Sequence, residues 1–300
     1  MNDGENNCFI NSVIQVLFYQ EDIRKVVLED LTCQACHPFC LLCALKDVFT
    51  FMMFPSKAVP TQPVRDALRR IDSSSVSFQS RSRGCAVETF GVILSHLHQR
   101  VESWGAHDLC LAHRFFSFEF VLRFACCEGT EVKLEKNCIY ISGARIVELT
   151  KEYGTNSSFS LILNVAVEEV NEINGRRACA CHAGERAQVL LQTSKLFMVN
   201  IDWQDSMKGS SKLFALFDKQ RINLRAVFDL DYCEGSSIYE INSIICYSKV
   251  LKHYIAVATS PKGWSVISDD ISISGSSKLI KFGLKLARLT PVILIYKQTK

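Results

Sequence analysis

The chain lacks the features of membrane and secreted proteins. Its 300 residues contain no apolar run that approaches the ~20 residues of a membrane-spanning helix. The first residues are polar, whereas a signal peptide needs a basic segment followed by an apolar one. We therefore expect no membrane partner, and a cytoplasmic or nuclear location.

Runs of like charge and internal repeats are lacking as well. No five consecutive residues carry the same charge, and the formal net charge is +3, from 34 basic and 31 acidic residues. Nucleic-acid partners usually require concentrated basic surfaces, so none is predicted. Without repeats or low-complexity linkers, and with 48% hydrophobic residues, the sequence predicts a single domain over residues 1–300.

Cysteine, by contrast, is abundant. Disulfides rarely persist inside cells, so the fourteen cysteines are expected to be metal ligands or buried thiols. Two Cys-x-x-Cys pairs can place four thiolates on one structural zinc ion, and His37 can replace one of them. The candidate ligands are Cys33, Cys36, Cys40 and Cys43. The alternative is that Cys40 and Cys43 are only core positions of a helix.

Other cysteines stand singly among apolar residues. They are expected to pack as small hydrophobic side chains. These residues are Cys85, Cys110, Cys138, Cys233 and Cys246.

Hydrophobic periodicity predicts helices first and strands later. Helices are expected over residues 8–20, 41–51, 62–70, 87–101 and 158–170. Strands are expected from residue 115 onward, and most clearly over residues 196–201, 226–230, 241–247, 254–259 and 292–296. Separate helical and strand-rich segments indicate an α+β fold.

The two ends of the chain carry a candidate nucleophile and its base. Cys8 is expected in the first turn of a helix, where the macrodipole and unpaired N–H groups lower a thiol pKa. His253 is expected at a strand start, and a hairpin over residues 260–263 can return Asp269 to the imidazole. Asp270 is the alternative orienting acid, since adjacent strand residues point to opposite faces. These groups suffice for thiol-dependent hydrolysis.

The segments around these residues resemble a known family. Residues 6–12 read Asn-Asn-Cys-Phe-Ile-Asn-Ser, and His253-Tyr254 is followed by Trp264 and by Asp269-Asp270. Both segments are similar to the boxes of the ubiquitin-specific proteases, or ubiquitin carboxyl-terminal hydrolases, which are cysteine peptidases that remove ubiquitin. The segments at 40–46 and 239–247 are similar to the branch of this family numbered fifty-three and fifty-four, whose members were long regarded as inactive.

The resemblance implies a fold and a set of roles. The fold would be papain-like, with a helical thumb (1–112), β-rich fingers (113–194) and a β-sheet palm (195–300). Cys8 would be the nucleophile, His253 the general base and then acid, and Asp269 the orienting group. Ubiquitin and ubiquitinated proteins would be the partners, and catalysis would need no cofactor. A second zinc site in the fingers, filled or decayed, would involve Cys126, Cys127, Cys179, Cys181 and His182.

The sequence departs from the family near the oxyanion. Most relatives place Asn five residues before the cysteine, but Asp3 stands there, and an ionised carboxylate cannot donate a hydrogen bond. The amides of Asn2, Asn6 or Asn7 are the candidate replacements.

Substrate binding departs from the family as well. The segment at 85–90 resembles the family's Asp-Ala-x-Glu-Phe, which makes Glu88 the candidate for binding the ubiquitin tail, although Cys85 replaces the Asp. A surface glutamate on an amphipathic helix is the alternative. The prediction is therefore a cysteine-type deubiquitinase. Its alternatives are an impaired ubiquitin-binding pseudoenzyme or scaffold, and a papain-like peptidase for other substrates.

Overall fold

The chain forms two compact units. The computed structural model describes residues 6–31, 33, 39–54, 59–79, 82–103, 110–124, 131–154, 158–175, 186–203, 221–228, 236–260, 263–269, 271–276 and 289–299. Unit 1 consists of Met1–Arg114 and Ser243–Ile293, and unit 2 of Phe115–Asn242 and Leu294–Lys300. Within the described residues, no helix has the length and apolar character to cross a membrane.

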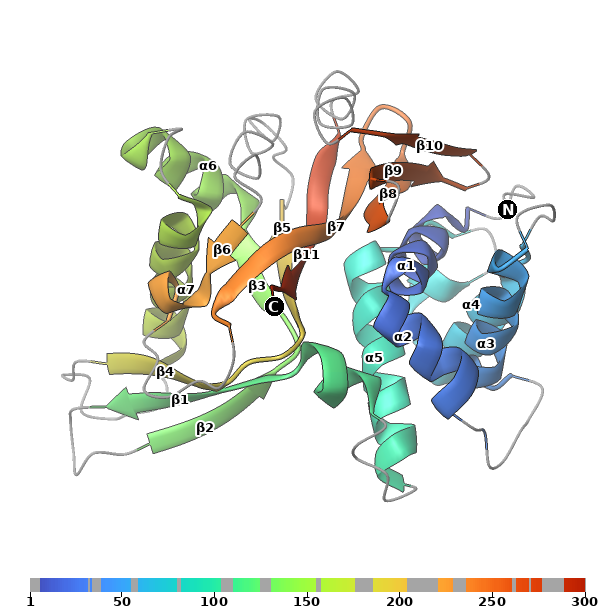
Figure 1. Cartoon of the computed structure of the whole chain (residues 1–300), viewed down its shortest axis with the longest axis horizontal. Helices are drawn as coiled ribbons and strands as arrows, with labels where there is room; N and C mark the ends of the chain where they lie inside the picture. Colours follow the sequence, from blue (N-terminus) through green and yellow to red (C-terminus); the bar gives the residue numbers. More distant parts are fainter. Residues whose placement is uncertain are drawn as a thin grey trace. The chain divides into compact units, whose positions relative to one another are not determined.

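Helices dominate the first part of unit 1 (Figure 1). Apolar residues at helical spacing bury one face of each long helix, which explains why these segments are helical. The long helices are α1 (Cys8–Tyr19), α3 (Leu41–Met52), α4 (Gln62–Ile71) and α5 (Ala86–Ser103). The four helices predicted here are confirmed to within two residues at each end. The shorter elements are α2 (Glu21–Lys25), η1 (Val26–Asp30), η2 (Val76–Phe78) and η4 (Ala112–Phe116), which begins in unit 1.

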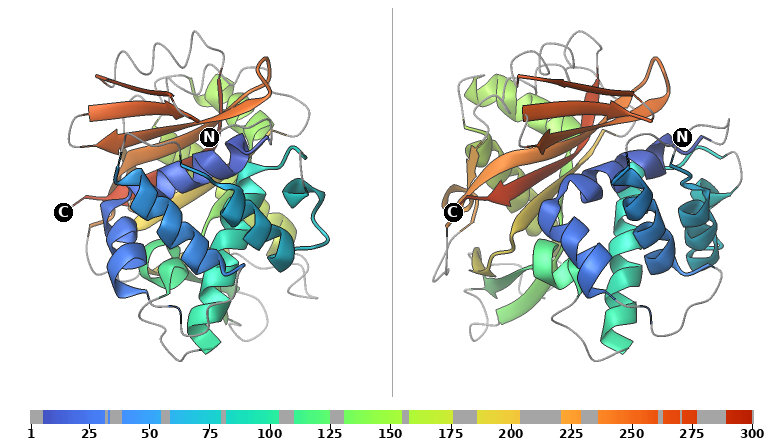
Figure 2. Two further views of the ribbon diagram at one scale, coloured as in Figure 1. Left: turned by 90° about the vertical axis from the view of Figure 1, so that its right-hand side faces the viewer. Right: turned by 45° about the vertical axis from the view of Figure 1, so that its right-hand side comes forward.

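An antiparallel sheet completes unit 1. Its strands are β8 (His253–Ser260), β9 (Gly263–Ser268), β10 (Ile271–Gly275) and the second half of β7 (Ile238–Ser248), in the order β10-β9-β8-β7. Helix α1 packs against β8 and β9, as both views of Figure 2 show. The helix that begins at Cys8 therefore lies against the strands that carry His253 and lead to Asp269.

Unit 2 is built mainly from strands. One sheet has the order β2-β1-β4, from β1 (Phe118–Phe124), β2 (Glu131–Lys136) and β4 (Arg186–Gln192). In the other sheet, β3 (Ile139–Ser142) pairs in parallel with β5 (Leu196–Asp202). The next strands in the order of this sheet are β11 (Thr290–Gln298) and then β7. The remaining elements are α6 (Gly143–Tyr153), α7 (Phe159–Gly175), β6 (Arg221–Asn223) and η6 (Leu224–Ala226).

The α+β class is confirmed, but two local predictions differ from the structure. The strand predicted over 226–230 is wrong for 226–228, because the N–H groups of Val227 and Phe228 bond back to the carbonyl of Leu224 in a tight turn. Helix α6 was not predicted; the hydroxyl of Ser142 accepts a hydrogen bond from Arg145 N at its start. The thumb, fingers and palm boundaries are a finer division than these two units and stay predictions.

Candidate active site

Cys8 is the first residue of α1 and is half-buried. The backbone N–H groups of Tyr254, Phe9 and Cys8 itself lie near its sulfur and act to lower the pKa of the thiol. Burial has a larger effect and raises the pKa of the Cys8 thiol above its ordinary value, and the negative charge of Asp269 raises it further. The prediction of a lowered pKa is therefore wrong, because desolvation outweighs the N–H groups at the helix start.

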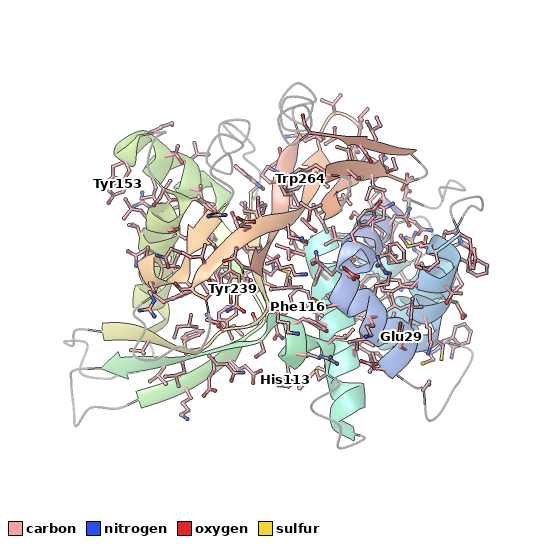
Figure 3. The ribbon with its side chains drawn as sticks, in the orientation of Figure 1. Glu29, His113, Phe116, Tyr153, Tyr239 and Trp264 are labelled. Atoms are coloured by element: carbon pink, nitrogen blue, oxygen red, sulfur yellow. The ribbon has the colours of Figure 1, made fainter. Side chains whose placement is uncertain are left out.

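His253 and Asp269 lie at neighbouring ends of the sheet in unit 1. Strands β8 and β9 pair antiparallel, which confirms the predicted hairpin and brings Asp269 back to His253. The His253 Nε2 atom is 3.6 Å from Oδ2 of Asp269 and 3.0 Å from Oγ of Ser268. Trp264, labelled in Figure 3, begins this return along β9. Asp270 lies outside the described residues.

The helix that begins at Cys8 also holds Asp269. Asn11 donates a hydrogen bond of 2.7 Å to Oδ1 of Asp269, and Gln15 donates one of 3.2 Å to its backbone carbonyl. The Thr61 hydroxyl donates in turn to Asn11 Oδ1, at 2.7 Å. The sequence analysis did not predict that Asn11 and Gln15 hold Asp269. The signal that could have revealed it is the presence of buried polar residues three to four positions apart on one face of a helix.

Three residues around the site have left-handed backbone. Asn6, Lys252 and Asp269 have φ values of 55°, 51° and 48°. Non-glycine residues adopt this region rarely, and the cost is of order 1 kcal/mol or more each. Each lies within two residues of Cys8 or His253, or is Asp269 itself. The surrounding contacts therefore hold the backbone in an unfavourable conformation beside the candidate site residues.

A narrow pocket opens beside Cys8. It is lined by Asn6, Cys8, Phe9, Arg83, Gly84, Tyr247, Lys252 and Tyr254. A Cβ atom added to Gly84 would lie 2.3 Å from the Phe9 ring, so only glycine fits there. Tyr247 and Tyr254 pack with their ring centroids 4.8 Å apart. The pocket is therefore bounded by aromatic rings and by a glycine in close contact with one of them.

The predicted oxyanion donors differ in their surroundings. Asn2 lies outside the described residues, whereas Asn6 lines the pocket. Asn7 is buried, and its Oδ1 accepts a hydrogen bond of 2.6 Å from the Arg65 guanidinium. Arg65 is itself buried and donates to backbone carbonyls of residues 78, 79 and 82. Asn6 is thus the predicted amide that faces the reacting sulfur's pocket.

Glu88 is engaged by serines. Its two carboxylate oxygens accept hydrogen bonds of 2.7 Å from Ser75 Oγ and 2.5 Å from Ser77 Oγ. A role in binding the ubiquitin tail stays a prediction. Cys85 is exposed, so the prediction that it packs as a buried thiol is wrong. Cys246 is fully buried among apolar strand residues, as predicted.

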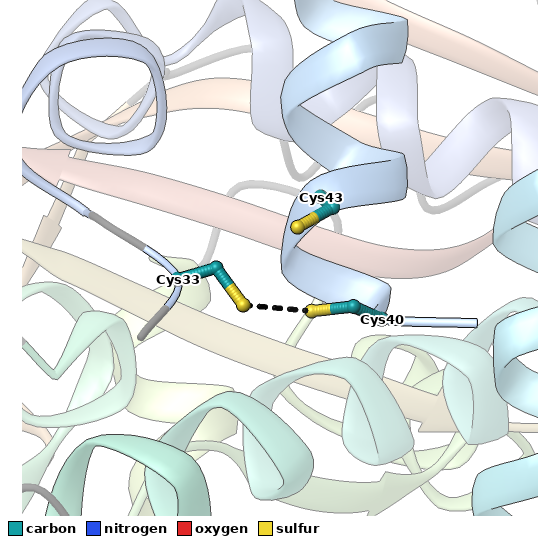
Figure 4. Close-up of side chains that lie close together, drawn as sticks. All are labelled: Cys33, Cys40 and Cys43. Carbon is teal, nitrogen blue, oxygen red and sulfur yellow. Dashed lines mark hydrogen bonds between the residues drawn. The ribbon is translucent and has the colours of Figure 1, made fainter. Parts of the chain in front are cut away.

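A cluster of sulfur atoms lies at the start of α3 (Figure 4). The Sγ atoms of Cys33, Cys40 and Cys43 all lie within 4.8 Å of one another, and those of Cys33 and Cys40 are 3.5 Å apart. Sulfur ligands of one tetrahedral zinc ion are separated by about 3.8 Å, given Zn–S bonds of about 2.3 Å. The three thiols therefore fit a structural zinc ion.

Other predicted metal ligands fall outside the described residues. For the cluster at α3 these are Cys36 and His37. For the predicted fingers site they are Cys126, Cys127, Cys179, Cys181 and His182. Cys233, predicted to pack as a small hydrophobic residue, is also outside the described residues.

Known proteins are similar to this chain in sequence. A family model described as ubiquitin carboxyl-terminal hydrolase matches residues 1–296. Human ubiquitin carboxyl-terminal hydrolase 53 is 24% identical over 290 residues, covering 90% of this chain and 27% of the relative. Mouse ubiquitin carboxyl-terminal hydrolase 54 is 25% identical over 219 residues, covering 67% of this chain and 14% of the relative. These relatives confirm the predicted branch.

A solved structure shares the fold. It is the SAGA Ubp8/Sgf11/Sus1/Sgf73 DUB module, with a TM-score of 0.66 and 13% sequence identity, over 98% of this chain and 67% of that chain. This chain spans about a quarter or less of the length of the two curated relatives. Because the family model covers almost every residue, the chain belongs to the ubiquitin carboxyl-terminal hydrolase family.

Proposed function

We propose that this chain is a thiol-dependent deubiquitinase that hydrolyses the isopeptide bond after the C-terminal glycine of ubiquitin. One observation carries the proposal. The backbone N–H of Tyr254, the residue next to His253, lies close enough to the Cys8 sulfur to lower the pKa of the thiol. The imidazole of His253 is in turn 3.6 Å from Asp269. These contacts support Cys8 as nucleophile, His253 as base and Asp269 as orienting carboxylate, the groups that acyl transfer requires.

The proposed reaction starts with a neutral thiol. Because burial raises the pKa of Cys8, its proton must be transferred when substrate arrives. Nε2 of His253 faces Asp269, which leaves Nδ1 to take that proton. The thiolate attacks the glycine carbonyl carbon, and His253 returns the proton to the departing lysine amine. Water, activated by the same imidazole, then cleaves the thioester.

The oxyanion donors of this chain differ from those of most relatives. The backbone N–H groups at the start of α1 already converge on the Cys8 sulfur, and Asn6 lines the same pocket. Asp3 replaces the amide that most relatives have, and loss of one such donor costs about 100-fold or more in rate. We therefore expect slow turnover, supported by the amide of Asn6.

The charge of the pocket favours a second candidate function. The ubiquitin tail, Leu-Arg-Leu-Arg-Gly-Gly, carries two arginines that prefer carboxylate partners. Arg83 and Lys252 line the pocket, and both carboxylate oxygens of Glu88 accept hydrogen bonds from serines. These features support a ubiquitin-binding pseudoenzyme or scaffold.

An electrophilic ubiquitin probe, which carries a thiol-reactive group at its C-terminus, separates these functions. A deubiquitinase forms a covalent adduct that is lost in Cys8→Ala and kept in Cys138→Ala, which removes a thiol of unit 2 instead. Tight noncovalent ubiquitin binding without labelling supports the scaffold. Hydrolysis of a short peptide without any reaction toward ubiquitin conjugates supports a different peptidase. We propose ubiquitinated proteins of the cytoplasm or nucleus as the partners.

A further inference from the structure

A second cluster of potential metal ligands lies at the far end of unit 1's longest helix. His98 is on α5, Cys110 precedes η4, and His113 is within η4. Figure 3 shows His113 beside the end of α5. Residues 86 and 98 are separated by about 18 Å along the helix axis, so the cluster is distinct from the Cys8 pocket. Three residues distant from the proposed chemistry thus converge.

The distances within the cluster match a shared ion. The ligand atoms of His98, Cys110 and His113 all lie within 4.8 Å of one another. The Cys110 sulfur is 3.4 Å from Nδ1 of His98. A sulfur and a nitrogen on one tetrahedral zinc ion are about 3.6 Å apart, given bonds of about 2.3 and 2.05 Å. The observed separation therefore needs only a small adjustment.

The local backbone explains why two of the ligands face the same way. The N–H of Arg114 bonds to the carbonyl of Cys110 at 2.9 Å, so a helical turn begins at Cys110. Residues three apart on a helical turn share a face, which places Cys110 and His113 together. His98 approaches from α5, with its ring centroid 4.6 Å from that of His113. Separate segments therefore supply the ligands, as in many structural metal sites.

The chemistry of these three ligands favours zinc over other metal ions. Imidazole and thiolate are the ligands that Zn²⁺ prefers, whereas Mg²⁺ and Ca²⁺ prefer oxygen. Cys110 is fully buried and both histidines are half-buried, so a thiolate there requires a positive charge beside it. Two neutral imidazoles, one thiolate and Zn²⁺ satisfy that requirement. Water can occupy the fourth tetrahedral position.

We propose that His98, Cys110 and His113 bind a zinc ion that connects η4 to α5. The ion would hold the end of unit 1 just before the chain passes into unit 2 at Phe115. Cys110 is buried, as predicted, and the proposal adds metal binding to its packing role. The proposal does not depend on the activity of Cys8.

Metal content of the purified full chain tests the site. After growth with zinc and dialysis, elemental analysis should give about one zinc fewer per chain in His98→Ala and in Cys110→Ser than in wild type. His96→Ala is the matched control, because His96 lies on the same helix but about 200° around its axis from His98. It should retain the wild-type content.

Absorption spectra of the cobalt-loaded protein give a second test of the site if one variant folds poorly. Wild-type protein loaded with Co²⁺ should show thiolate-to-cobalt absorption that is weaker in the conservative variant Cys110→Ser, while circular dichroism is unchanged. Equal metal content and equal cobalt spectra in wild type, His98→Ala and Cys110→Ser would overturn the proposal. The contact between His98 and Cys110 would then be an ordinary hydrogen bond.

Discussion

Asn11 is a single residue that connects two parts of the candidate site. It belongs to the helix that begins at Cys8, yet its amide bonds the carboxylate that faces His253. The residue is 1% exposed, so both ends of its amide depend on protein partners. Asn11 thus links the helix of Cys8, the proposed nucleophile, to Asp269, and we propose that it positions this carboxylate.

Replacing Asn11 by alanine should affect rate more than binding. Asn11→Ala removes the bond to Asp269 and leaves the buried Thr61 hydroxyl without its acceptor, at a cost of about 1–3 kcal/mol. We expect kcat to fall about tenfold to 100-fold, since base orientation is lost. The acidic limb of the pH–rate profile should shift, with ubiquitin affinity unchanged. Thr61→Val, the control, should change kcat less; an unchanged kcat in Asn11→Ala contradicts this role.

Gly84 is the other residue whose identity is constrained. Gly84→Ala would place a methyl group 2.3 Å from the ring of Phe9, which is 1% exposed and has no room to move. Overpacking of this kind costs about 1–3 kcal/mol. Gly91→Ala is the control, because nothing lies within 4 Å of the added atom; helix propensity should make it about 0.5–1 kcal/mol more stable. Urea unfolding that shows Gly84→Ala as stable as wild type would refute the close packing.

At the scale of elements, periodicity predicted the long helices because each buries one apolar face. The strands around His253 and the hairpin to Asp269 were predictable for the same reason, from alternation and turn residues. Helix α6 was missed because its start depends on a cap at Ser142. The turn at 226–228 was misread as a strand because its apolar residues fit either structure. Local caps and turns decide such segments, and periodicity does not report them.

The cluster at α3 was predictable only from cysteine spacing. If Cys33, Cys40 and Cys43 hold zinc, Cys43→Ser should lower the metal content by about one ion and reduce the free energy of unfolding by several kcal/mol. Cys85→Ser, which alters an exposed thiol, should change neither. Elemental analysis and thermal unfolding are the measurements. Wild-type metal content in Cys43→Ser would instead support simple packing of these cysteines in α3.

For the whole molecule, the site geometry could not be read from the sequence alone. The order of Cys8, His253 and Asp269 was visible, but the helix contacts that hold Asp269 arise from packing over more than 250 residues of chain. The pKa of Cys8 was also mispredicted, because burial depends on the tertiary fold. Local patterns therefore indicated which residues matter, and long-range packing decided their surroundings.

Alkaline pH should destabilise the protein. Burial raises the pKa of several acidic groups, so they ionise in the unfolded chain before they ionise in the folded one. The unfolded state then binds fewer protons, and stability falls as pH rises above about 8.5, where exposed thiols titrate. The groups are Cys8, Cys138, Cys246, Tyr254 and Tyr296. Burial lowers the pKa of Lys136, so this one group makes the folded state more stable as pH rises and opposes the trend.

Unfolding between pH 7 and 10 measures this effect. For the fully buried Cys246 the loss is at most about 1.4 kcal/mol per pH unit. Cys246→Ala should therefore show a shallower decline than wild type, and Tyr153→Phe, at an exposed position, is the control. A melting temperature that is constant up to pH 10 would contradict the prediction.

The most direct measurement of the proposed chemistry is steady-state hydrolysis of a fluorogenic amide at the ubiquitin C-terminus. We predict slow turnover by the wild-type chain, none by Cys8→Ala, and a rate reduced by at least about 100-fold in His253→Ala, where the thiol remains but its base is lost. Turnover that persists in Cys8→Ala, or equal rates in wild type and His253→Ala, would contradict the account.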